Sequence, residues 1–144
     1  MKIKKMRIFL TFLGFLFLLY ILFKIFSFLF ITDEKIIYLK PKDLFFEYTK
    51  ISIQPLPLKN ESPFNFLITI QSNQDPDMID LDIKATALLE TNNATYEPKS
   101  WVILKREKYK IQGKLIFNEK FKNQKKIKLI IFDGDQFSLS WPLK

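Results

Sequence analysis

A nearly unbroken apolar run over residues 8–31 constrains this chain more than any other feature. One charge, Lys24, interrupts the run, and four cations precede it: Lys2, Lys4, Lys5 and Arg7. About 20 apolar residues in a helix cross a bilayer core of roughly 30 Å. The run therefore predicts a membrane-spanning helix, with residues 8–23 in the bilayer core and residues 25–30 near the outer interface.

The flanking charges predict how this helix is oriented. Cations are retained on the cytoplasmic side, so we expect a single-pass protein of the cell membrane whose N-terminus is cytoplasmic and whose C-terminal part is extracytoplasmic. The long stem of Lys24 can carry its ammonium to the interface, and pairing with an acidic residue of a partner helix is the alternative.

A cleaved signal peptide has a shorter apolar core followed by small residues. Because the first alanine is Ala85, we expect the helix to be kept as an anchor.

Length and charge indicate one further domain. The chain has 144 residues, which leaves room for one compact domain after the helix. We expect the basic flank and helix in residues 1–32, a short stalk in residues 33–43 that could add a first strand, and the domain in residues 44–144. The net charge of +8 is mostly an orientation signal, because the first 32 residues hold five cations and no acid. Nucleic acid is therefore not an expected partner.

Alternation of apolar and polar residues after residue 43 is typical of half-buried strands. It predicts strands at 49–54, 64–71, 101–104, 109–117, 127–132 and 137–141, together with 79–90 as one bent strand or two in succession. We find no helical period after residue 32. The predicted fold is mainly β: an antiparallel, immunoglobulin-like sandwich of about seven strands behind the transmembrane helix.

Two local features support this sandwich. Asp133, Gly134 and Asp135 separate the last two strands, and Gly134 can adopt the positive φ that a tight hairpin needs. With no cysteine in the chain, stability must come from apolar burial, and each large aromatic side chain can bury on the order of 150–250 Å². The expected aromatic core residues are Phe64, Phe66, Trp101, Phe117, Phe132 and Trp141.

Three segments carry a family resemblance: IDLDIKATALLETNNATYEPKSW (79–101), GKLIF (113–117) and KIKLIIFDGDQFSLSW (126–141). In the order and spacing of its strands, the chain resembles a family of uncharacterised prokaryotic membrane-anchored β-sandwich domains. The resemblance implies an anchored, immunoglobulin-like domain. Relatives often have a histidine pair between the tryptophan and the glycine, and this chain has no histidine, so no metal or proton role carries over to that loop.

Cations concentrate in the C-terminal half of the chain. The residues of a possible polyanion-binding face are Lys105, Arg106, Lys108, Lys110, Lys114, Lys126 and Lys128, and further lysines follow at 120, 122 and 125. Such a face would attract anionic wall polymer or lipid headgroups. A merely solvated surface is the competing interpretation, because lysine at outward strand positions also discourages edge pairing.

Four aspartates, Asp75, Asp77, Asp80 and Asp82, are the one candidate cation site. Their spacing lacks the glycine and distal glutamate of an EF-hand loop, so we interpret them as turn residues and expect no metal. Without histidine or cysteine the usual nucleophile and base pairs are missing, and we expect neither enzymatic activity nor a cofactor. The expected partners are the lipid bilayer and another envelope component, either a protein or an anionic polymer.

Overall fold

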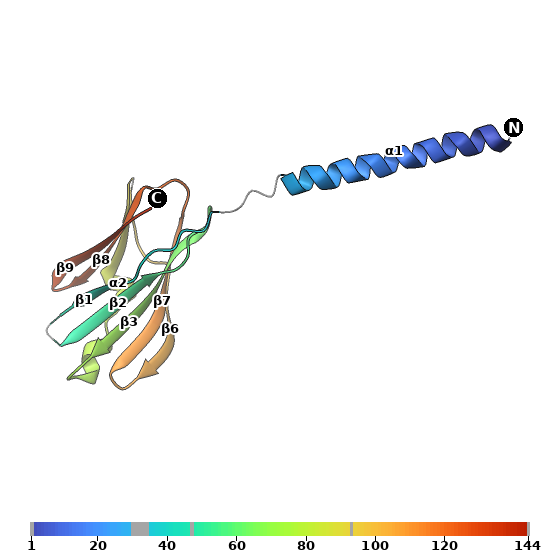
Figure 1. Cartoon of the computed structure of the whole chain (residues 1–144). Coiled ribbons are helices and arrows are strands. Elements are labelled where there is room, and N and C mark those ends of the chain that lie inside the picture. The colour runs from blue at the N-terminus through green and yellow to red at the C-terminus, as the bar shows by residue number, and fades with distance from the viewer. Residues whose placement is uncertain (1, 30–34, 47, 93, 144) are drawn as a thin grey trace. The chain divides into compact units, whose positions relative to one another are not determined.

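The chain forms two compact units, Met1–Glu34 and Lys35–Lys144. The computed structural model describes residues 2–29, 35–46, 48–92 and 94–143. In the first unit, α1 (Lys2–Leu29) is a continuous helix (Figure 1), and its stretch Leu10–Ser27 is long and apolar enough to cross a membrane. The predicted apolar helix is therefore confirmed, whereas residues 30 and 31 of the predicted span lie outside the described residues.

The second unit is built from two antiparallel sheets (Figure 1). The first sheet contains β1 (Lys42–Phe45), β2 (Thr49–Pro55), β3 (Pro63–Ser72), β6 (Ser100–Glu107) and β7 (Lys110–Lys120) in the order β1-β2-β3-β7-β6. The second contains β4 (Ala87–Thr91), β5 (Thr95–Tyr96), β8 (Lys126–Asp133) and β9 (Asp135–Pro142) in the order β5-β4-β8-β9. The predicted mainly-β architecture is confirmed. The described residues form nine strands rather than about seven, because β1 and the two-residue β5 add to those expected.

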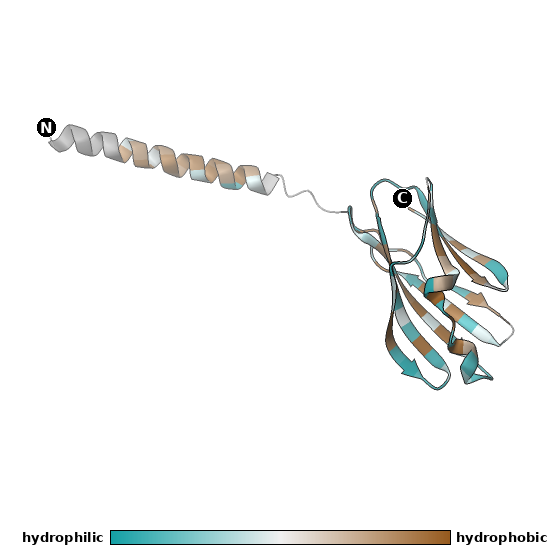
Figure 2. Ribbon diagram, turned by 180° about the vertical axis from the view of Figure 1, so that it is seen from behind, coloured by the Kyte–Doolittle hydropathy of each residue, from teal (hydrophilic) through white to brown (hydrophobic). Residues whose placement is uncertain are grey.

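Strand alternation places the core between the two sheets. In β2 and β3 every second side chain is buried, including Ile51, Ile53 and Phe66, and the residues between them are more exposed. The second sheet contributes Leu89 and Leu129 to the same cluster. Figure 2 shows the corresponding hydrophobic and hydrophilic bands alternating along the strands. Burying each such side chain contributes about 1.5–3 kcal/mol, so this cluster is the main source of stability.

The aromatic core is close to the predicted one, with one error. Phe64, Phe66, Phe117 and Trp141 are almost fully buried. Trp101 is only partly buried, at the margin of the cluster. The expectation for Phe132 is wrong, because 39% of this residue is exposed. Its neighbour Ile131 faces the core, and successive strand residues point to opposite faces, so Phe132 points outward.

The expectation of a strand over residues 79–86 is also wrong. A 3-10 helix, η1 (Pro76–Ile79), ends where this segment begins, and one turn of α-helix, α2 (Ile83–Thr86), completes it; the strand begins only with β4 at Ala87. The Asp75 side chain accepts a hydrogen bond from the backbone N–H of Asp77, and the Asp82 side chain accepts one from Ala85. These side-chain caps accept hydrogen bonds from backbone N–H groups that would otherwise need a partner in a neighbouring strand. The prediction that no helix follows residue 32 fails for the same reason.

The final hairpin agrees with the prediction. Asp133 pairs with Asp135, and Gly134 between them has a φ of 71°.

At the other end of the domain, residues 35–43 of the expected stalk belong to the second unit. Ile37 forms an isolated bridge with Leu58 there, so this segment lies along the sandwich.

Candidate binding surfaces

The structure does not bring the seven predicted polyanion-binding residues onto one face. Lys105, Lys110 and Lys114 lie on the outer side of the first sheet: Lys105 is paired in register with Gln112, and the residues beside Gln112 point into the core. Lys108 lies in the turn between β6 and β7 and not at an outward position of a strand. This outer side is therefore only one part of the expected face.

An ion pair partly neutralises this first group of cations. Lys105 pairs with Glu107, and this hydrogen bond raises the pKa of Lys105 and lowers the pKa of Glu107. Gln112 donates to Thr69 Oγ1 at 3.2 Å on the same side of the sheet. The outer side of the first sheet is thus a polar surface in which positive and negative groups are mixed.

Arg106 has a different environment, at the inner side of β6. Its register partner is the buried Ile111, and its Nη1 lies 2.6 Å from Asp80 Oδ1. The guanidinium therefore faces one of the four aspartates that the sequence presented as a candidate cation site and that we interpreted as turn residues. Asp75 and Asp82 cap the short helices, and the described residues contain no group of three or more acidic side chains placed to hold a metal ion.

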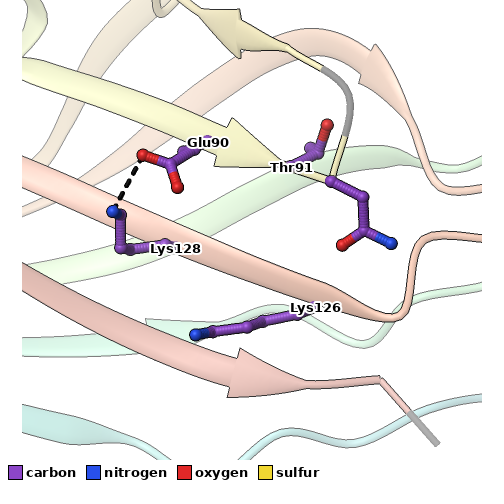
Figure 3. A pocket seen from close by; sticks show the side chains of 5 residues that line it. Glu90, Thr91, Lys126 and Lys128 are labelled. Atoms are coloured by element: carbon purple, nitrogen blue, oxygen red, sulfur yellow. Dashed lines mark ion pairs between the residues drawn. The ribbon is translucent and has the colours of Figure 1, made fainter.

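The remaining two residues of the set belong to the second sheet. Lys128 Nζ lies 2.8 Å from Glu90 Oε2 across β8 and β4, and both line a hollow of about 180 Å³ (Figure 3). Lys126 and Thr91 line it as well, and Figure 3 shows no ion pair from Lys126 to the residues drawn. Because the two sheets have opposite outer sides, these lysines are separated from Lys105, Lys110 and Lys114. Binding of a polyanion by all seven as a set stays a prediction.

Sequence reasoning missed a surface at the edge of the first sheet. Among the described strands, β6 is bonded to β7 alone. It exposes Val102, Ile103 and Leu104 to 44%, 46% and 57%. The signal was present in the sequence, since an apolar run without alternation puts apolar side chains on both sides of a strand. This edge is therefore both apolar and free to pair.

A groove runs along the inner side of β6. Its volume is about 240 Å³, and η1 and the residues up to Asp82 form its other wall. The edge strand of the opposite sheet, β5, has only two residues, and neither of them lines the groove. The lining is mainly apolar, from Ile79, Leu81, Trp101, Ile103 and Ile111, with Asp80, Asp82 and Arg106 at its charged part.

The opposite side of the sandwich is closed, in contrast to β6. Phe46 and Phe137 make an edge-to-face contact with ring centroids 4.3 Å apart. Lys42 Nζ donates to the carbonyl of Ser140 at 2.6 Å, linking β1 to β9. Side-chain contacts thus close the sandwich at the β1 side, whereas a groove lies beside β6 on the other side.

A further hollow, of about 290 Å³, lies beside the turn between β1 and β2. The lining includes Phe45 and Lys50, whose ammonium lies 5.4 Å from the ring centroid of Phe45. Lys50 Nζ also lies 2.8 Å from Asp43 Oδ2. Hydrogen bonds from Lys50 and Ser52 lower the pKa of Asp43 below its ordinary value. The ammonium of Lys50 in this hollow is therefore already paired with Asp43 and is less available to an outside anion.

Comparison of the chain with protein-family models, with curated proteins and with solved structures gave no match. The resemblance of residues 79–141 to anchored β-sandwich domains therefore stays a prediction. The functional argument depends on the surfaces described above.

Proposed function

We propose that this protein is a non-enzymatic, membrane-anchored adaptor whose extracytoplasmic domain binds an extended segment of another envelope protein along β6. The anchor is α1, which has the length and composition of a membrane span. The orientation follows from the four cations that precede residue 8, because such charges are retained in the cytoplasm.

We further propose that the domain is of the immunoglobulin type. The support is the strand order: with β2, β3, β6 and β7 taken as A, B, D and E, the first sheet reads A-B-E-D after the extra β1. With β4, β8 and β9 taken as C, F and G, the second sheet reads C-F-G after β5. This is the arrangement of immunoglobulin constant-type domains. Domains of this architecture serve many functions, so the argument for binding depends on the surface and not on the fold.

The single observation that carries the proposal is the apolar free edge of β6 beside the groove. An extended peptide can add to such an edge through main-chain hydrogen bonds, while alternate side chains enter pockets on one side of the sheet. Ile103 and Trp101 point toward the groove, so an added strand would place one apolar side chain between them and Leu81. Soluble proteins usually protect an edge of this kind.

The second half of β6 has such protection. The register with β7 shifts between Ile103 and Lys105, which indicates a bulge at Leu104, and charged residues follow. A bulge twists an edge away from further pairing. We therefore place the partner strand against Ser100–Ile103, with Leu104 as the limit of the pairing segment.

Site-specific photocrosslinking of the full-length protein in its native membrane tests this proposal. A photoreactive residue at Val102 is expected to capture one defined protein, identified by mass spectrometry. The matched control is the same residue at Phe45, which is 71% exposed on the other edge strand of the sheet. Equal capture of that protein from both positions would contradict a β6 site.

A charge substitution sharpens the test. Ile103→Lys puts an ammonium at the mouth of the groove, and the half-exposed position should still permit folding. We expect capture from position 102 to be lost in this variant and kept in Phe45→Lys, with unchanged thermal unfolding in both. Capture of wall polymer or lipid alone, in a complex that dissociates at raised salt, would contradict the proposal.

A further inference from the structure

A second set of lysines gathers at the end of the domain through which the chain enters. Four segments meet there: residues 35–40, the β2–β3 loop, the β7–β8 loop and the C-terminal residues. Ile37 bridges Leu58, the Glu61 N–H donates to the carbonyl of Phe121 at 2.7 Å, and the Leu143 N–H donates to Lys125 at 2.8 Å. Their backbones are therefore fixed side by side; we call this region the entry end.

Seven exposed lysines belong to the entry end: Lys35, Lys40, Lys59, Lys120, Lys122, Lys125 and Lys126. Of these, Lys122 is in an ion pair in the described part of the chain, with Glu61 at 3.9 Å. The acidic residues there are Glu61 and Glu119, together with Glu90, which lines a hollow with Lys126 and is paired with Lys128; Asp33 and Glu34 precede Lys35 in the sequence. Positive charge therefore exceeds negative charge in this region.

The entry end also exposes apolar and aromatic side chains. Tyr38 is 74% exposed and Ile36 is 38% exposed, whereas Ile37 between them packs against the core. Tyrosine suits a membrane interface because its ring is apolar and its hydroxyl stays hydrated. The opposite end of β3 is mixed in charge, since Asp75 and Asp77 lie beyond it and Lys110 of β7 pairs in register with Gln71 there.

We propose that the entry end binds an anionic lipid surface, with its lysines at the headgroups and Tyr38 at the interface. Lysine is a hydrated point charge that attracts anionic headgroups without fixed geometry, and this suits a fluid surface. The exposed Ile36 and Tyr38 beside the lysines favour a lipid surface, because a bilayer offers an apolar layer next to its anionic headgroups. This inference rests on the proposed membrane anchor, but it is independent of partner binding at β6.

Full-length protein in vesicles provides the test. The chain has no cysteine, so Asn60→Cys gives a single labelling position at the entry end and Gln74→Cys gives one beyond the other end of β3. Energy transfer from each label to acceptors on lipid headgroups is measured in phosphatidylcholine vesicles with and without phosphatidylglycerol. We expect transfer from position 60 to rise with phosphatidylglycerol and fall at raised salt, and transfer from position 74 to stay lower.

A four-lysine variant with a matched control distinguishes binding by the entry end from attraction by the positive charge of the domain as a whole. Each lysine near an anionic surface strengthens attachment by roughly fivefold. The variant Lys59→Gln, Lys120→Gln, Lys122→Gln, Lys125→Gln should therefore reduce docking by more than about a hundredfold. The control Lys105→Gln, Lys108→Gln, Lys110→Gln, Lys114→Gln removes the same charge elsewhere and should retain docking.

Three outcomes would overturn the inference. One is an unchanged signal on adding phosphatidylglycerol, and a second is an equal loss in both four-lysine variants. The third is a response of the label at position 60 to soluble polyphosphate but not to phosphatidylglycerol, which would favour an anionic polymer. Failure of the protein to float with the vesicles would instead refute the anchor itself, so the two proposals fail in distinguishable ways.

Discussion

Gly113 illustrates how one residue sets the packing at the margin of the core. It lies on the inner side of β7, where the indole of Trp101 from β6 covers it. A Cβ added to Gly113 would lie 2.3 Å from Trp101 Cη2 and 2.5 Å from Cζ2. The absence of a side chain therefore allows the indole to lie flat on the neighbouring strand.

We expect Gly113→Ala to destabilise the domain by about 1–3 kcal/mol, the usual cost of inserting atoms into a packed site. Denaturant unfolding of the full-length protein in detergent measures this value. Trp101→Leu removes the clashing ring, so Gly113→Ala should cost clearly less in that background. Equal costs in the two backgrounds would show that the indole is not the cause.

The binding surfaces were harder to predict than the core, because they depend on contacts between residues that are distant in the sequence. The alternation that identifies Phe66 and Phe117 as buried is local, and the structure agrees. The partner of Arg106 is Asp80, 26 positions away, and no local pattern indicates this ion pair. Whether a lysine shares a face with another depends on which sheet its strand joins, and this depends on long-range pairing.

At the scale of elements, residues 79–86 show the limit of periodicity. Ile79 and Ile83 are buried and Leu81 packs against the core, so the spacing resembles that of a strand. Pro76 at the start of η1 and the two capping aspartates turn the backbone into short helices instead. By contrast, the alternation of the last two strands and the turn residues around Gly134 indicated the same structure, and the hairpin was predicted correctly.

The pairing of β1 with β2 leads to a prediction about pH. The Lys50 ammonium and Ser52 keep the pKa of Asp43 low. A lowered folded-state pKa stabilises the protein above the unfolded value of about 3.9, and this stability is lost as pH falls through the folded value. Lys50→Met should therefore raise the Asp43 pKa toward its ordinary value. Carboxyl NMR titration tests this; a midpoint that does not move would exclude Lys50 as the cause.

At the scale of the whole molecule, the proposed arrangement is a cytoplasmic flank, one span and an external domain. We expect a maleimide that cannot cross membranes to label Asn60→Cys in intact cells, because this exposed residue lies in the domain. A cysteine at Lys4, in the basic flank, is the control and should react only after permeabilisation. Reversed labelling would contradict the orientation inferred from the flanking cations.

The position of Trp141 constrains when the domain can fold. Its ring fills the core beside Phe66, and its indole N–H donates to the carbonyl of Lys40 at 2.7 Å, 101 positions earlier. Until β9 has left the ribosome, a growing chain lacks both this ring and the final strand. Contacts of such long sequence separation form slowly. For the external domain proposed above, we therefore expect the apolar helix to meet the export machinery while the domain behind it is still unfolded, and the sandwich to close only after translocation.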